Sequence, residues 1–225
     1  MNLNSFEINA GRALSACAKQ FYERGWMWGT SGNLSLRLKK APSIFLVTPS
    51  GVNKGALEPE QLIVIGDDQP RCAGASRPKP GQEPLPSAET QVHQMLYETE
   101  PECHAVLHVH PAAATFISGV FGHALERRLL PLAWIEMMKG VGVMDGRTGI
   151  LPIFPNWQDI PRFAGEVKDY WMNTPGQKIP AILIYNHGLT AWGRTLDEAR
   201  NHLEVLEYVC DQRYRELCAQ KEPST

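Results

Sequence analysis

The sequence predicts a mixed α/β layered domain with a mainly antiparallel central β-sheet flanked by helices. Segments whose apolar residues follow helical spacing interleave with roughly seven to nine short β-rich runs. The early β-rich runs lie only a few residues apart, which suits antiparallel neighbours, because parallel strands need a long crossover between them. With 225 residues, no repeat and no low-complexity tract, the chain is expected to form one domain over residues 1–225.

In the first part of the chain, one helix and three strands are expected. The helix covers Ser5–Arg24, where the apolar positions follow helical spacing and Gly25 ends the pattern. A strand is expected at Asn33–Leu38, because polar and apolar residues alternate there. Two further β-rich runs, Ile44–Thr48 and Gln61–Ile65, complete this group of strands.

The middle of the chain begins with a long loop over Gly66–Pro86, which is rich in glycine, proline and polar residues. A helix is expected over Ser87–Tyr97, with Ser87 as its N-cap. A strand follows at His104–His110, and Pro111 ends it. The same proline opens a helix over Ala112–Ser118.

In the last part of the chain, the pattern that predicts secondary structure is weak at first and clear toward the end. Short extended pieces are expected within Pro131–Ile153, and a helix over Gln158–Met172. Ala181–Tyr185 has the composition of a buried strand, and Leu189–Trp192 is expected to be its neighbour. A long helix over Leu196–Cys218 follows.

Composition narrows the class of function. A formal net charge of -2 argues against nucleic acid as the main partner, because nucleic-acid-binding proteins usually carry a basic stripe. No apolar run reaches the roughly 18 residues of a membrane span, and the N-terminal residues lack the pattern of a signal peptide. The five cysteines are scattered and contain no CxxC pair, which favours reduced thiols in a cytoplasmic protein.

The segment AVLHVHP places two histidines one residue apart in an apolar run. On a strand, His108 and His110 project to the same face about 6.6 Å apart, so both can bind one metal ion. His104 shares that face but lies about 13 Å from His108, too far to join the same ion. Two packed, hydrogen-bonded histidines explain the segment equally well, so the pair alone leaves both interpretations open.

A catalytic metal site needs a third protein ligand and an open position. The candidates are His93, His123, His187 and His202. His187 is the best of them, because it follows an apolar strand and precedes a glycine, where an irregular backbone can direct a side chain into a site. Cys103 is a possible soft ligand, but it lies an odd number of positions from His108. Its side chain would therefore point to the opposite face of the strand.

Two glycine-containing turns precede these histidines. TSGN (Thr30–Asn33) and TPSGVNKG (Thr48–Gly55) combine hydroxyl residues with glycines that expose backbone N–H groups, and the second contains Lys54. Such turns can bind an anion, and so can a helix N-terminus like that expected at Ser87. Ordinary turns and an ordinary N-cap use the same residues, so these signals are weak when taken one at a time.

Two carboxylates lie in apolar or small-residue surroundings, Glu89 in PSAE and Glu136 in WIEMMKG. Near a metal and away from bulk water, either could serve as a general acid or base. The structural alternatives for Glu89 are a first-turn helix charge or an i, i+4 pair with His93, and for Glu136 an ion pair with Lys139 or Arg147.

Taken together and in order, TSGNLSLR, TPSG, PSAE, HVHP and NHG resemble the motifs of the class II aldolase and adducin-head superfamily over nearly the whole chain. The resemblance implies a class II aldolase-like fold and a homotetramer with sites near subunit interfaces. It also implies one Zn²⁺ per subunit on His108, His110 and His187. One departure is Ala88, which replaces the second serine of the usual PSSE. The phosphate-binding residues that the resemblance implies are Gly32, Asn33, Ser50, Gly51, Lys54 and Ser87.

Within the superfamily, the segments SGVNKG, WIEMMKG, LPIFPNWQDI and NHGLTAWG resemble the dehydratase branch, because the aldolases lack a block like IEMMKG. This implies a zinc-dependent hydro-lyase that converts 5-methylthioribulose 1-phosphate to 2,3-diketo-5-methylthiopentyl 1-phosphate in methionine salvage. Glu136 is then the expected acid/base, with Glu89 in reserve. The alternatives are a sugar-phosphate aldolase or 4-epimerase, and a non-catalytic interaction domain of the adducin-head type.

Overall fold

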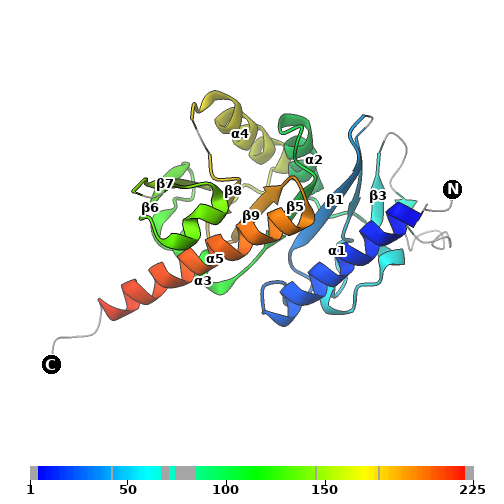
Figure 1. Ribbon diagram of the computed structural model, residues 1–225, viewed down its shortest axis with the longest axis horizontal. Coiled ribbons are helices and arrows are strands. Elements are labelled where there is room, and N and C mark those ends of the chain that lie inside the picture. Colours follow the sequence, from blue (N-terminus) through cyan, green and yellow to red (C-terminus); the bar gives the residue numbers. More distant parts are fainter. Residues whose placement is uncertain are drawn as a thin grey trace.

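Figure 1 shows a computed structural model of the chain, which describes residues 5–41, 43–66, 71–73, 85–144, 146–176 and 178–220. The described residues form one nine-stranded sheet in the order β4-β3-β2-β1-β5-β9-β8-β7-β6. Neighbouring strands are antiparallel except β7 and β8, which run parallel. The predicted fold class, helices around a mainly antiparallel sheet, is confirmed.

The elements of the first part agree with the sequence predictions except at one place. A short strand, β4, lies inside the predicted loop and pairs with β3 through Ile63 and Cys72. The loop prediction is therefore wrong at this strand, and residues 67–70 and 74–84 lie outside the described residues. The elements are α1 (Ser5–Glu23), β1 (Asn33–Lys39), β2 (Ile44–Val47), the 3-10 helices η1 (Lys54–Ala56) and η2 (Pro59–Gln61), β3 (Ile63–Ile65) and β4 (Arg71–Cys72).

In the middle of the chain, α2 (Thr90–Thr99) begins three residues later than expected. Ser87 is not its N-cap, because Glu89 holds that position and makes no side-chain capping bond. Instead, the Ser87 hydroxyl accepts the backbone N–H of Glu89 in a turn before the helix. The strand β5 (Ala105–Val109) and the helix α3 (Ala112–Phe121) follow as predicted.

The weak region of the sequence contains a strand, a 3-10 helix and a second strand. The parallel pair β7 and β8 is connected by α4, as expected of a parallel crossover. The elements of this part are β6 (Arg128–Leu132), η3 (Glu136–Val141), β7 (Gly149–Phe154), α4 (Ile160–Asn173), β8 (Ala181–Ile184), β9 (Gly188–Gly193) and α5 (Leu196–Ala219).

Two hydrophobic layers cover the two faces of the sheet. One packs α1, α3 and α5 against residues such as Leu107 and Val109, and the other packs α2 and α4 against residues such as Val106 (Figure 1). Side chains alternate along β5, so His108 projects to the face of α2 and α4. No helix in the described part of the chain is long and apolar enough to cross a membrane.

Candidate metal centre

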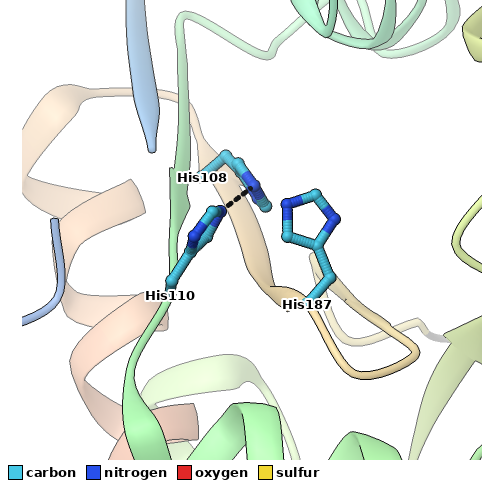
Figure 2. A group of neighbouring side chains, drawn as sticks. All are labelled: His108, His110 and His187. Atoms are coloured by element: carbon cyan, nitrogen blue, oxygen red, sulfur yellow. Dashed lines mark hydrogen bonds between the residues drawn. The ribbon is translucent and has the colours of Figure 1, made fainter. Parts of the chain in front are cut away.

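Three histidines from two distant segments converge at one edge of the α2 and α4 face. His108 lies near the end of β5, His110 directly after that strand, and His187 in the turn between β8 and β9 (Figure 2). One nitrogen from each ring lies within 4.8 Å of the other two. The Nε2 atoms of His108 and His110 are 2.9 Å apart. The three candidate ligands that the sequence favoured are therefore brought together.

The backbone around His187 explains how its ring reaches β5. Asn186, just before it, has a left-handed backbone with φ of 50°, which turns the chain sharply after β8. The His187 carbonyl accepts the hydroxyl of Thr115 at 2.9 Å. A side chain at Gly188 would overlap the Val109 carbonyl, so only glycine lets this turn approach β5 so closely.

The chemistry of the cluster fits a divalent metal ion. Burial, together with the neighbouring His108, lowers the pKa of His110 to about 3 and the pKa of His187 to about 4. Both rings are therefore neutral at pH 7, which is the form that binds a metal. His108 directs Nδ1 to the Thr190 hydroxyl at 2.9 Å, which leaves its Nε2 for the cluster.

Glu89 lies against the same cluster. Its carboxylate oxygens are 3.4 Å from His108 Nε2 and 3.6 Å from His187 Nε2. The side-chain amide of Asn33 donates to Glu89 Oε2 at 2.6 Å. Burial acts to raise the pKa of Glu89, but the two histidines and the Asn33 hydrogen bond outweigh it and hold the pKa at about 2. An ionised carboxylate thus borders the three imidazoles.

The first glycine turn is part of this site. Gly32 has φ of 73°, and a side chain there would overlap the His108 carbonyl and Met27. Asn33 follows it and pairs with His108 across β1 and β5. The Asn33 amide also lies 3.3 Å from the Ser87 hydroxyl, so the turn, the residues before α2 and the histidines form one group.

The second glycine turn is more open. Ser50 and Gly51 are exposed, and Gly51 has φ of 70°. The Ser50 backbone N–H donates to the Leu85 carbonyl at 2.8 Å, which holds this turn beside the segment that leads to Ser87. Lys54, in contrast, is buried, and its ammonium donates to the carbonyls of Thr30 and Val52.

The buried ammonium of Lys54 therefore links the two turns. The distances from its Nζ are 3.2 Å to the Thr30 carbonyl and 2.9 Å to the Val52 carbonyl. Burial lowers its pKa to about 8. Both carbonyls belong to the predicted phosphate turns, so the geometry gives Lys54 contacts with the protein backbone.

Glu136 is not brought to the histidines within the chain. Its side chain is 75% exposed and forms an ion pair with Lys139 at 2.7 Å, the structural alternative considered for it. It begins η3, which contacts α5.

The other candidate ligands lie elsewhere or face away. His202 contacts the Trp192 carbonyl, His123 accepts the N–H of Leu125, and Cys103 donates to the Ala105 carbonyl. His93 is buried on α2, and its Nδ1 is 2.7 Å from the Ser35 hydroxyl. Sequence reasoning missed Thr190, although a threonine inside the apolar run LTAW was a visible signal.

We expect the metal-free protein to lose stability on mild acidification. Burial is the main cause that lowers the pKa values of His93, His110 and His187, to about 3, 3 and 4. From pH about 6.5 downward, the unfolded chain binds protons that the folded chain does not, so each histidine lowers the free energy of unfolding by up to about 1.4 kcal/mol per pH unit. Glu89 adds a loss in the same direction below about pH 4.5.

Urea unfolding in the presence of a chelator, at pH 7, 6 and 5, measures this effect. His93→Gln removes one of the three buried imidazoles and should reduce the pH dependence, whereas His123→Gln, outside the cluster, is the control and should leave it unchanged. A free energy of unfolding that stays constant from pH 7 to 5 without metal would contradict the expectation.

We expect Gly119→Ala to weaken metal binding from outside the site. A side chain at Gly119 would overlap the Asn186 side-chain oxygen and disturb the turn that presents His187. A loss of about 10- to 100-fold in zinc affinity is expected, as for other groups that orient metal ligands. Gly165→Ala in α4 is the matched control, because its side chain would meet no atom within 4 Å. Competition with a fluorescent chelator measures both affinities, and equal values would refute the prediction.

Comparison with known proteins identifies the family of the chain. The family model described as "Class II Aldolase and Adducin N-terminal domain" matches residues 12–214. A methylthioribulose-1-phosphate dehydratase from Microcystis aeruginosa is 36% identical over 198 residues, 88% of this chain and 91% of that protein. A probable bifunctional methylthioribose-1-phosphate isomerase/methylthioribulose-1-phosphate dehydratase from Nocardia farcinica is 39% identical over 201 residues, 89% of this chain. The match spans 34% of that longer protein.

Solved structures agree on the fold. YgbL from Escherichia coli, described as a putative aldolase/epimerase/decarboxylase, superposes with a TM-score of 0.73 at 26% identity, over 93% of this chain and 90% of that one. The L-fuculose-1-phosphate aldolase of Thermus thermophilus gives 0.70 at 23% identity, over 96% and 100% of the two chains. With the family model matching nearly the whole length, the chain belongs to the class II aldolase and adducin N-terminal domain family.

Proposed function

We propose that the protein is a hydro-lyase that dehydrates 5-methylthioribulose 1-phosphate to 2,3-diketo-5-methylthiopentyl 1-phosphate, a step of methionine salvage. The observation that carries the proposal is the cluster of three histidines with the ionised Glu89 against it. The curated relatives named as methylthioribulose-1-phosphate dehydratases, which match most of the chain, support the choice of substrate. The buried thiols of Cys17, Cys103 and Cys210 form no disulfide, which supports a location in the reducing cytoplasm.

The metal that we propose for His108, His110 and His187 is Zn²⁺, one per subunit. Three imidazoles with one open position are a common ligand set for catalytic zinc, although iron, cobalt and manganese also accept such ligands. When bound, zinc supplies a Lewis acid that stabilises negative charge on the substrate oxygens. Thr190 would hold His108 in the tautomer that binds metal through Nε2.

We assign the substrate phosphate to the two glycine turns and the residues before α2. Gly32 and Gly51 offer backbone N–H groups, and Asn33, Ser50 and Ser87 offer polar side chains. Because Ala88 has no hydroxyl, backbone groups supply more of the contacts. Lys54 supports both turns through the Thr30 and Val52 carbonyls, and its positive charge favours an anion above them.

The reaction removes the proton from C3 and the hydroxyl from C4 as water, and the resulting enol relaxes to the 2,3-diketone. Two proton transfers are needed, so a second acid or base complements Glu89. Glu89 already borders the histidines. We assign Glu136 as the second group, which transfers a proton to the departing hydroxyl.

Because Glu136 lies away from the histidines of its own chain, it can act only on the metal site of a neighbouring subunit. Exposed apolar residues cluster in the elements around it, as expected of a subunit interface in a homotetramer. They are Leu129 on β6, Met137 on η3, Met144 after η3 and Ile150 on β7, with exposed fractions from 40% to 57%.

A substrate panel on the zinc-loaded protein tests the function. We expect consumption of 5-methylthioribulose 1-phosphate with release of water, and no cleavage of fuculose 1-phosphate or epimerisation of ribulose 5-phosphate. Carbon–carbon cleavage or epimerisation in place of dehydration would instead identify a sugar-phosphate aldolase or 4-epimerase. A protein that binds no metal would be an interaction domain of the adducin-head type.

A further inference from the structure

A small cavity lies behind Glu89, between α2, α4 and the sheet. The centre of a water molecule can occupy about 10 Å³ of this cavity, which is enough room for one water. Most of its lining surface is apolar, and its polar members are Glu89, His93, His108 and Thr190. A cavity of this size can hold an ordered water when polar groups in its wall offer two to four hydrogen bonds.

One side chain that lines the cavity has a ring nitrogen without a hydrogen-bond partner. His93 is 1% exposed, and its Nε2 has no hydrogen-bond partner among the described residues. Its other ring nitrogen, Nδ1, is 2.7 Å from the Ser35 hydroxyl. Buried polar atoms are nearly always paired, either with protein or with water. The orphaned Nε2 is thus an independent indication of a ligand in the cavity.

The tautomer of His93 depends on the hydrogen-bond chain behind it. The Tyr97 hydroxyl is 2.7 Å from the Ser35 hydroxyl and 3.5 Å from the His104 carbonyl. Two arrangements fit these contacts. If Tyr97 donates to Ser35, then Ser35 donates to His93 Nδ1, and His93 Nε2 carries the hydrogen; if Tyr97 donates to the His104 carbonyl, the hydrogen lies on Nδ1. Because the contact between Tyr97 and Ser35 is the shorter of the two, we take the first arrangement, with His93 Nε2 as a donor toward the cavity.

Thr190 supplies a second donor. If His108 holds a metal through Nε2, its Nδ1–H donates to the Thr190 hydroxyl, at 2.9 Å. The hydroxyl hydrogen of Thr190 is then free to donate elsewhere. The carboxylate oxygens of Glu89 supply an acceptor. Two donors and one acceptor therefore line the same space, which matches the three hydrogen bonds that a buried water typically makes.

We propose that one ordered water occupies this cavity, accepts hydrogen bonds from His93 Nε2 and Thr190 Oγ1, and donates to the Glu89 carboxylate. His93 is then a positioning residue, which holds Glu89 through the water and connects it to Ser35 and Tyr97. The water site rests on the geometry and on a metal bound by His108 through Nε2, whereas the effect of His93 on turnover rests on the proposed function.

The water is tested without any substrate. A high-resolution crystal structure of the zinc-loaded protein is expected to show density within hydrogen-bond distance of His93, Thr190 and Glu89. Nitrogen-15 spectra of the imidazoles are expected to show His93 with its hydrogen on Nε2, and Ser35→Ala is expected to remove that preference. An empty cavity, or a direct hydrogen bond between His93 and Glu89, would overturn the proposal.

The role of His93 is tested with a pair of variants. His93→Leu is expected to lower kcat about 10- to 100-fold, the usual cost of losing a group that orients a catalytic site, while KM and the zinc content stay near their original values. His93→Gln keeps an N–H donor and is expected to recover most of the loss. His123→Gln, in a turn that has no part in the cavity, is the control.

The outcomes separate this role from the proposed function. An unchanged kcat in His93→Leu would overturn the positioning role. If His93→Leu does not fold, Ser35→Ala serves in its place, and a kcat equal to the original would be the refuting result. If the original protein dehydrates no substrate, the proposed function fails while the crystallographic and spectroscopic tests of the water still decide the site.

Discussion

Replacing His108 by alanine is expected to abolish both zinc retention and turnover. His108 lies within hydrogen-bond distance of His110, Thr190 and Glu89, so its loss removes one ligand and the contacts that orient the rest. A Lewis acid supplies several kcal/mol of transition-state stabilisation, so turnover should fall at least about a thousand-fold. Zinc content by atomic emission and the rate of dehydration measure the two effects.

His104→Ala is the matched control for this variant. His104 lies four residues earlier, just before β5, and its ring contacts the Glu102 carbonyl, away from the cluster. It should retain one zinc per chain and full turnover. Retention of stoichiometric zinc by His108→Ala would show that the metal binds elsewhere and would refute the assignment of the site.

Glu89→Gln and Glu136→Gln are each expected to be nearly inactive, and a mixture of the two should be active. Loss of an acid or base costs about 10²- to 10⁴-fold in kcat. If Glu136 acts on the site of a neighbouring subunit, oligomers reassembled from equal amounts of both variants contain intact sites. Random assembly gives about one quarter of the original sites. Turnover before and after mixing under reversible dissociation measures this recovery.

The controls decide between two arrangements. Each variant dissociated and reassembled alone should remain inactive, and both should keep their zinc. If mixing restores no activity, the two carboxylates act on one site from the same chain, and the intersubunit assignment is wrong. If Glu136→Gln alone is fully active while Glu89→Gln is inactive, Glu89 is the only essential carboxylate.

Local sequence patterns predicted most of the fold. The amphipathic helices were located because burial of one face imposes a helical period. The strand that contains His108 and the strand before His187 were located because each is a short apolar β-rich run. The strand β4 was missed, since two residues are too short to show a period. The start of α2 was placed too early because Ser87 looked like an N-cap, whereas its hydroxyl instead accepts the Glu89 N–H in a preceding turn.

The sequence predicted most residues of the candidate site but not how they are arranged in space. The spacing of His108 and His110 and the glycine after His187 pointed to the cluster, and the fold brings the three together. The proximity of Glu89 to them was not predictable, because it depends on how α2 packs beside β1 and on the Asn33 side chain. The exposed position of Glu136 likewise depends on tertiary packing, which one local motif does not encode.

The pairing of His108 with Thr190 across β5 and β9 has a consequence for folding. Side chains alternate between the two faces of a sheet, so a shift of this pairing by one residue would turn His108 away from His187. A metal ion can therefore bind all three rings only when the two strands align correctly. During folding, the metal would select the native alignment and trap it, and the rate at which refolding chains capture zinc would report when these two strands join.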